Sequence, residues 1–402
     1  MPPSDRPKAP AMTLRSLSSP HSREASVTHA NAFGFLRLLL ATLVIVSHFP
    51  QLVDGDARRE LLFRLSGGRT GFGDVAVDGF FVISGYLITA SLLTSGSGSE
   101  YLAKRVTRIV PGFVVATIAS LFIVAPLGGC QLATIAAEWR MNLLATFMLH
   151  EPVVTCAFAG THYPDVNGAM WTIAHEFRCY LLVLVLGLTG VLRQRALVPV
   201  LAVVLFLDYE IVHGFVPLPG LRQAIVDHLP IFWSDDASRL TAIFLVGATF
   251  HLYRDSLRFT ARTAAVALAG ALVASAIPAL VEPALGTLGG YALLAFGLGA
   301  KSGPFARINN RTDTSYGVYL YGWPTGKLLL WYWPTIAFAS GLAANIALAW
   351  LVGWLSWTIV ERPSLAAARR WLKSGAQVRA SQGRPDGADA AVVGDEVMAA
   401  VN

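Results

Sequence analysis

The chain has 402 residues, of which 54% are hydrophobic and 14% are charged. Soluble domains carry roughly 25% charged residues, so this composition excludes an ordinary soluble domain and predicts an all-α, polytopic membrane protein. The net charge of +6 does not indicate a nucleic-acid partner, because the basic residues fall mostly in short loops between apolar runs. The sequence shows no zinc-ligand spacing, P-loop or internal repeat, and we expect no metal site.

The composition divides the chain into three segments. Residues 1–30 are polar, combine both charge signs and lack the apolar core of a signal peptide, so we expect a disordered cytoplasmic arm. Residues 31–365 contain the apolar runs and are predicted to form one membrane domain. Residues 366–402 are rich in Ala, Gly and Asp, and we expect a disordered cytoplasmic tail.

The apolar runs predict a bundle of about ten membrane helices, each near the ~20 residues that a bilayer requires. A weaker segment, 131–149, predicts an amphipathic helix that could be re-entrant. The ten runs lie near residues 33–52, 75–93, 111–127, 170–192, 197–211, 239–253, 263–280, 284–300, 315–333 and 335–360.

Basic residues orient these helices, because cytoplasmic loops are enriched in Lys and Arg. They gather in alternate loops, which places both termini in the cytoplasm. They include Lys104, Arg105, Arg108, Arg193, Arg195, Arg254, Arg258, Arg262, Lys301, Arg307, Arg311, Arg362, Arg369, Arg370 and Lys373. The loop between the first two apolar runs does not fit this pattern, because the predicted topology places it outside the cytoplasm although it is rich in arginine. We expect this loop to fold down over the functional site. Its arginines are Arg58, Arg59, Arg64 and Arg69.

The first apolar run carries Arg37 near one end and His48 near the other. Eleven steps of roughly 100° bring both side chains to the same helix face, ~16 Å apart along the axis. An arginine in hydrocarbon costs at least ~2.5 kcal/mol, so such residues usually face a bundle interior or a wet cavity. The alternative is that Arg37 reaches the headgroups and His48 is an interfacial residue. The other charged motifs favour the first interpretation.

The second run contains the stretch VDGFFVISGYLIT, residues 77–89. Asp78 would either cap this helix near its N-terminus or pair with a buried cation. Ser84 and Gly85 are small and would let another helix or a thin ligand approach closely, so Ser84 is a candidate supporting residue.

Arg105 and Arg108 stand at the cytoplasmic entry to the third run, and their i, i+3 spacing places both on one helix face. Two guanidinium groups on one face can bind a phosphate or diphosphate. Ordinary positive-inside charge is the alternative, and it is favoured when this motif is considered alone. Pro111 marks the point at which the helix bends or begins.

The fourth run opens with WTIAHEFRCY, residues 171–180, and places Glu176 about a turn and a half into an apolar helix. A carboxylate at this depth is expected to have a partner. One candidate is His48, whose tautomer a carboxylate would fix. A structural ion pair with an arginine is an equally good interpretation.

Other residues receive structural interpretations. Cys179 lies in an apolar helix and is expected to be a small core hydrophobe. Cys130 and Cys156 fall in one region outside the cytoplasm, where the sequence leaves their pairing open. Lys327 is expected to extend to the membrane interface, and Glu361 is expected to hold loops together.

Together, six stretches resemble the acyltransferase-3 family of membrane O-acyltransferases over roughly residues 31–365. Any one stretch would be a weak signal, but all six stand in family order. They are LRLLLATLVIVSHF, DVAVDGFFVISGYLIT, KRVTRIVPGF, WTIAHEFRCY, SYGVYLYGWP and VERP.

The resemblance implies roles for specific residues. Arg37 and His48 match the family's Arg-x10-His pair, which implies a donor-binding arginine and a catalytic histidine. Glu176 matches the acid of a Trp-x4-Glu-x3-Tyr stretch, which implies a second catalytic residue. Donor binding is further implied for Arg105 and Arg108, which match an Arg-x-x-Arg pair. Trp171 and Tyr180, from the same stretch as Glu176, are candidate supporting residues.

The family transfers an acyl group, commonly acetyl, from acyl-coenzyme A to a hydroxyl. The resemblance therefore implies acetyl-coenzyme A as a donor substrate, with no permanently bound cofactor. It implies a polysaccharide or lipid-linked glycan as acceptor, or sometimes a small molecule such as an antibiotic. It also implies a multi-pass protein of the bacterial inner membrane, in contact with membrane lipid.

Two departures from the family pattern matter. Gly322 stands where many members have a histidine, so we assign that position no role. Without the esterase-like domain of some members, the membrane unit is expected to complete the transfer itself or to pass the acyl group to a partner. A transporter or exporter of glycans would share the buried charges, although the sequence shows no pair of matching halves.

Overall fold

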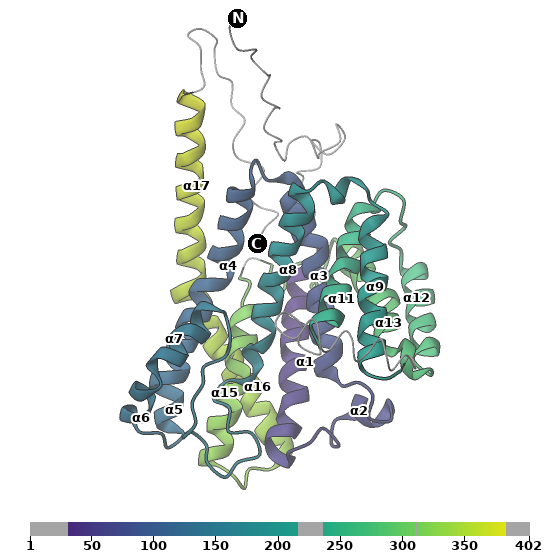
Figure 1. Ribbon diagram of the computed structural model, residues 1–402. Helices are drawn as coiled ribbons and strands as arrows, with labels where there is room; N and C mark the ends of the chain where they lie inside the picture. Colours follow the sequence, from purple (N-terminus) through teal and green to yellow (C-terminus); the bar gives the residue numbers. More distant parts are fainter. Residues whose placement is uncertain (1–30, 216–235, 311, 383–402) are drawn as a thin grey trace, which may run out of the picture.

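The computed structural model describes residues 31–215, 236–310 and 312–382, and within these residues the regular structure is helical with no strand. Figure 1 shows the long helices gathered into one bundle. The predicted all-α fold is therefore confirmed. The predicted arm at residues 1–30 lies outside the described residues.

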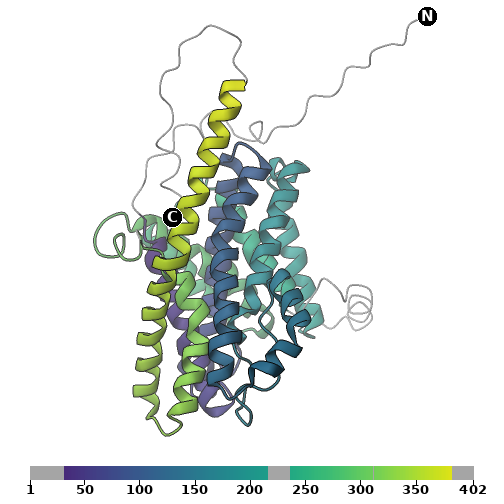
Figure 2. The ribbon, with the colours of Figure 1, turned by 90° about the vertical axis from the view of Figure 1, so that its left-hand side faces the viewer.

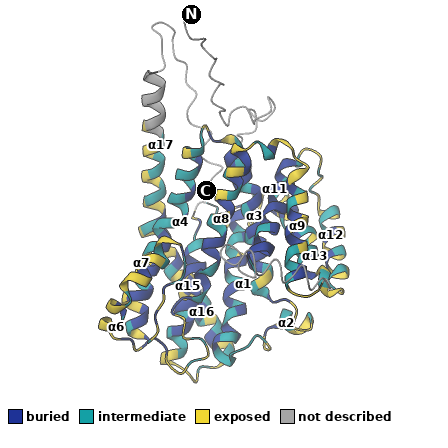
Figure 3. Ribbon diagram, in the orientation of Figure 1, coloured by how far each residue is buried: buried dark blue, intermediate teal, exposed yellow. Residues whose placement is uncertain are grey.

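The centre of the bundle is built from helices that carry most of the predicted motifs. Helix α3 packs against α1 and α11, and α15 packs against α1. Figure 3 shows many buried residues along α1, α3 and α11. The central helices are α1 (Phe33–Asp54), α3 (Phe72–Thr94), α8 (Trp171–Leu188), α11 (Ala237–Leu252) and α15 (Ser315–Tyr332).

Outer helices surround this centre and expose large apolar side chains such as Val203, Val273 and Trp350, as expected of a surface that faces lipid. Figure 1 shows α4 and α17 on one side of the centre and α9, α12 and α13 on the other. The outer helices are α4 (Gly98–Ala119), α9 (Leu197–Val212), α12 (Ala261–Ala274), α13 (Val281–Ala284), α14 (Gly290–Gly299), α16 (Phe338–Ser356) and α17 (Arg362–Gln382). Short helices in the connections are α2 (Leu61–Leu65), α5 (Ala125–Leu127), α6 (Leu132–Ala137) and α7 (Trp139–Phe147).

Six helical segments among the described residues are long and apolar enough to cross a membrane. Helices α11 and α12 are apolar but shorter. The count of about ten spans and the cytoplasmic placement of the termini remain predictions. The six segments are Phe33–Asp54, Phe72–Thr94, Gly98–Leu127, Gly168–Leu188, Pro278–Gly299 and Phe338–Leu372.

The structure corrects two predicted boundaries. Residues 366–382 are not a disordered tail but part of α17, because Ala, Leu and Arg favour a helix and α17 packs against α4. Figure 2 shows α17 continuing past the end of the bundle. Helix α4 begins at Gly98, where Ser97 caps it by accepting from the Glu100 amide at 3.1 Å. Pro111 therefore lies inside the helix and does not begin it.

A disulfide joins Cys130 to Cys156, with their Cα atoms 5.1 Å apart, and the pairing that the sequence left open is confirmed. It ties the segment after α5 to the long connection before α8. The predicted amphipathic segment 131–149 forms α6 and α7 between the two cysteines. Cys179 is free and buried, as expected of a core residue.

Helices α3 and α11 cross so closely that Gly85 and Gly247 leave no room for a side chain. A Cβ atom at Gly85 would lie 1.9 Å from the Phe244 carbonyl oxygen, and one at Gly247 would lie 2.1 Å from the Val82 carbonyl oxygen. The crossing leaves room only for a glycine at position 85. The prediction that Gly85 lets another helix approach closely is therefore confirmed.

We predict that Gly85→Ala destabilises the protein by about 1–3 kcal/mol or more, because the added methyl group forces two backbones apart. The expected result is a lower melting temperature of the purified protein in detergent. Gly289→Ala is the matched control, since a Cβ atom there meets nothing within 4 Å. Equal melting temperatures for the two variants would contradict the close crossing.

Candidate active site

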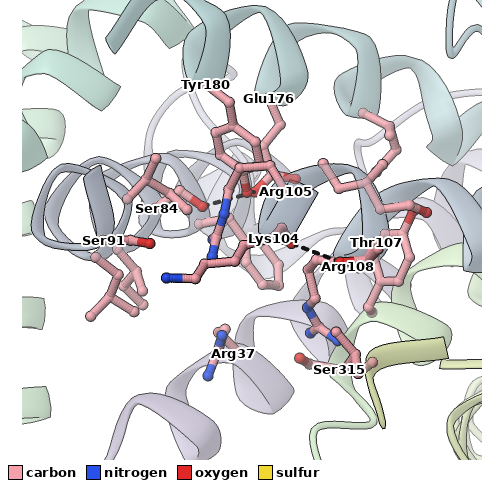
Figure 4. Close-up of a pocket in the computed structure, with 18 of the residues that line it drawn as sticks. Arg37, Ser84, Ser91, Lys104, Arg105, Thr107, Arg108, Glu176, Tyr180 and Ser315 are labelled. Atoms are coloured by element: carbon pink, nitrogen blue, oxygen red, sulfur yellow. Dashed lines mark hydrogen bonds between the residues drawn. The ribbon is translucent and has the colours of Figure 1, made fainter. Parts of the chain in front are cut away.

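Two cavities lie inside the bundle. The first, which we call the basic cavity, is lined by residues of α1, α3, α4, α8, α15 and α17. Figure 4 shows the labelled arginines and Lys104 gathered around it. Among the described residues, its charged lining consists of Arg37, Lys104, Arg105, Arg108, Arg369 and Glu176.

The second cavity, which we call the His48 cavity, lies near the C-terminal end of α1. His48 and Gln51 line it from α1, and the Gln51 side-chain oxygen lies 3.2 Å from His48 Nδ1. Trp171 contributes from the start of α8. The Trp323 ring does not line the cavity but meets the imidazole edge-on, with ring centres 5.0 Å apart. The contacts with Gln51 and Trp323 hold the imidazole between α1 and α15.

The two cavities adjoin, because Val77 of α3 and Tyr319 of α15 line both of them. The Tyr319 hydroxyl donates to the Ala169 carbonyl at 2.6 Å and lies 2.5 Å from the Thr172 hydroxyl. These bonds fix the phenol ring against the start of α8. Tyr319 and Val77 therefore form the partition between the basic cavity and the His48 cavity.

Arg37 and Arg108 share one carboxylate. Asp313 lies 3.3 Å from Arg37 and 2.6 Å from Arg108, and Arg108 also meets Glu361 at 3.2 Å. Burial raises the pKa of Asp313, but Arg108 and then Arg37 outweigh this, so its pKa lies below its usual value. Asp313 was not among the predicted site residues, although it stands just before an apolar run, much as Asp78 stands near the start of its own run.

Arg105 differs from these two arginines. It is only 6% exposed, and no described carboxylate lies within ion-pair distance of it. The rings of Tyr101 and Tyr180 lie 6.0 and 5.9 Å from its guanidinium carbon, and its Nε has no hydrogen-bond partner among the described residues. A buried cation that lines a cavity and has no described ion-pair partner is a strong candidate for binding an anion.

Glu176 does not contact His48, which corrects the expected orienting contact. Its carboxylate accepts from Ser84 at 2.8 Å and from Tyr180 at 2.6 Å, and it lines the basic cavity. The reason is the position of Glu176 along α8. Trp171, at the start of this helix, lines the His48 cavity, and Glu176 lies five residues, or about 7.5 Å, further along the helix and away from that cavity. The structure does bring together Ser84, Glu176 and Tyr180, which the sequence singled out separately.

Asp78 pairs with a buried cation and does not cap its helix. Its partner is Arg239 of α11, which also pairs with Asp236 at 3.1 Å and Glu282 at 3.2 Å. Arg239 reaches the lining of the His48 cavity. This role of Arg239 could not be predicted from the sequence, because Arg239 stands at the start of an apolar run and Asp78 and Glu282 come from distant segments.

The arginine-rich loop after α1 covers the His48 cavity, as expected, since Ala57, Glu60 and Phe63 line it. Ser47 donates to Glu60 at 2.6 Å, and the Phe72 amide donates to the same carboxylate, which anchors the loop to α1 and α3.

Lys327 does not extend to an interface, which corrects that prediction. It is buried and donates to Thr161 Oγ1 at 2.7 Å and to the Tyr163 carbonyl.

The structure thus defines a helical membrane protein with a cationic cavity next to a cavity that presents a histidine. The acyltransferase-domain model of the acyltransferase-3 family matches residues 31–358, so the chain belongs to this family of membrane O-acyltransferases. It is similar to an O-acetyl transferase of Shigella phage Sf6, with 27% identity over 341 residues, 83% of this chain and 95% of the relative. It is also similar to nodulation protein 10 of Rhizobium leguminosarum bv. viciae, with 26% identity over 381 residues, 86% of this chain and 95% of the relative. A search of solved structures finds no match.

Proposed function

We propose that this acyltransferase moves an acetyl group from acetyl-coenzyme A to a hydroxyl of a polysaccharide or lipid-linked glycan in the bacterial inner membrane. The observation that carries the proposal is the adjacency of the two cavities, which meet at Val77 and Tyr319. One cavity is lined by cations suited to a phosphorylated donor, and the other presents a histidine suited to activating a hydroxyl. The relative from phage Sf6, named O-acetyl transferase, supports the choice of acetyl.

The donor would occupy the basic cavity from the cytoplasmic side. Arg105 would bind a phosphate of its diphosphate, since its guanidinium has no carboxylate partner among the described residues. Arg37 and Arg108 would add positive potential while remaining paired with Asp313. The acyl-bearing arm would then pass Tyr319 toward the His48 cavity.

The acceptor would occupy the His48 cavity. With Gln51 accepting from Nδ1, the unprotonated Nε2 of His48 would take the proton of the acceptor hydroxyl as its oxygen attacks the thioester carbonyl. The carbon–sulfur bond breaks, and the departing thiolate takes up a proton to give free coenzyme A. The alternative is attack by Nε2 itself, which forms an acyl-histidine that the hydroxyl then cleaves.

The test uses purified protein in nanodiscs, acetyl-coenzyme A labelled in its acetyl group, and a cell-envelope glycan extract. We expect release of coenzyme A that requires the glycan, with the label recovered as a base-labile ester on the glycan. Release without labelled glycan would contradict the proposed acceptor class. Failure to bind acetyl-coenzyme A would overturn the proposed donor.

The partition at Tyr319 gives a second prediction. Tyr319→Ala should raise hydrolysis of the donor severalfold relative to transfer, because loss of the ring widens the opening between the two cavities and lets water reach the thioester alongside the acyl-bearing arm. The measurement is the ratio of free acetate to acetylated glycan. Tyr319→Phe is the control, since it keeps the ring and removes only its hydrogen bonds to Ala169 and Thr172. An unchanged ratio in Tyr319→Ala would show that the ring is not the barrier.

A further inference from the structure

Helix α17 forms one wall of the basic cavity, although it lies beyond the residues that match the family model. Leu365, Ala368, Arg369 and Leu372 line the cavity. Their spacing, i, i+3, i+4 and i+7, is that of a single helix face. The wall therefore consists of three apolar side chains and one cation.

Helix α17 also runs antiparallel to α4, so the position of Arg369 along the cavity can be estimated. Glu361, immediately before α17, pairs with Arg108 of α4. Arg369 stands eight residues further, which is about 12 Å along a helix, toward the end where α4 begins. Figures 1 and 2 show α17 passing beside that end of α4. His48 lies the other way, eleven residues beyond Arg37 on α1.

Arg369 has no ion-pair partner among the described residues, unlike Lys104, which pairs with Glu100 at 2.8 Å. A cation at the far end of the cavity is well placed for a second anionic group of a long ligand. Coenzyme A carries such a group, because its 3′-phosphate lies at the opposite end from the thioester, beyond the diphosphate.

We propose that α17 completes the donor site and that Arg369 binds the 3′-phosphate at the nucleotide end of the donor. This inference rests on the proposed donor, acyl-coenzyme A. Arg105 would bind the diphosphate deeper in the cavity, and the apolar face of α17 would contact the adenosine. The enzyme would thereby distinguish coenzyme A from acyl carriers that end in a simple phosphopantetheine group.

The experiment compares binding of acetyl-coenzyme A with binding of acetyl-dephospho-coenzyme A, which lacks only the 3′-phosphate. We expect Arg369→Gln to weaken binding of acetyl-coenzyme A about tenfold, since a charged hydrogen bond is lost, and to leave the dephospho donor almost unaffected. Arg370→Gln is the matched control, because Arg370 is the adjacent, exposed arginine that does not line the cavity. Arg370→Gln should change neither affinity.

Equal weakening of both donors, or no weakening of either, would overturn the assignment of Arg369. A competition assay with adenosine 3′,5′-bisphosphate gives a second measurement, in which the inhibition constant of this ligand should be lower for wild type than for Arg369→Gln. If Arg369→Gln does not fold, Arg369→Lys should retain part of the preference for the 3′-phosphate, and an unchanged preference would overturn the assignment. A wild-type protein that binds neither donor would instead overturn the proposed function.

Discussion

His48→Gln is expected to abolish acetyl transfer, with a fall of at least about 100-fold in kcat/KM, while donor affinity stays at the wild-type level. The transfer falls because the side chain that takes the acceptor's proton, or that carries the acyl group, is gone. Donor affinity stays because His48 lies in the cavity beyond Tyr319, whereas the proposed donor-binding residues Arg37, Arg105 and Arg108 line the other cavity. The measurements are glycan acetylation and equilibrium binding of labelled acetyl-coenzyme A.

The control for this prediction is His213→Gln, because His213 is an exposed histidine outside both cavities. It should transfer acetyl groups like the wild type. Full transfer by His48→Gln would exclude both the general-base and the acyl-histidine mechanisms. Loss of donor binding together with transfer would show that His48 acts on the donor site or on folding.

A single-turnover experiment without acceptor separates the two mechanisms. An acyl-histidine requires one equivalent of coenzyme A to be released and the acetyl label to remain on the wild-type protein but not on His48→Gln. A general base leaves the thioester intact until a hydroxyl arrives. Label on the protein would therefore assign His48 as the nucleophile.

Features that depend on local spacing could be predicted from the sequence. The eleven-residue interval between Arg37 and His48 placed them about three helical turns apart, and the structure puts them at two adjoining cavities. Gly85 was predicted to permit close approach, and the neighbouring helix is α11.

Partners that come from distant segments could not be predicted in the same way. Asp313, which joins Arg37 to Arg108, and Arg239, which pairs with Asp78, are brought to the site only by packing of whole helices. The proposed contact between Glu176 and His48 was wrong for a different reason. The i, i+4 spacing of Glu176 and Tyr180 already offered the carboxylate a local hydrogen-bond partner.

Arg105→Gln is expected to weaken binding of acetyl-coenzyme A by about 10–100-fold without destabilising the free protein. The affinity falls because the variant loses a charge-assisted hydrogen bond to phosphate in a buried site. Stability is kept, because the wild-type guanidinium is buried without a described carboxylate partner, and its removal leaves no acid unpaired. The measurements are the dissociation constant and the melting temperature, each with and without the donor.

Arg108→Gln provides the contrast. Loss of the Arg108 guanidinium leaves Glu361 without its arginine and leaves Asp313 with only its longer ion pair, to Arg37. Breaking a buried ion pair costs about 3–5 kcal/mol. This variant should melt at a lower temperature even without donor. Arg178→Gln is the neutral control, because Arg178 is exposed and lines neither cavity.

The two arginines are thus distinguished by when their positive charge is compensated. Arg108 is compensated by Asp313 and Glu361 in the free protein, whereas Arg105 would be compensated only by the donor. Bound donor should therefore raise the melting temperature of wild type and of Arg178→Gln. The rise should be much smaller for Arg105→Gln, because the stabilisation that a ligand gives increases with its affinity. An equal donor-induced rise in Arg105→Gln would assign the donor phosphates to other residues of the basic cavity.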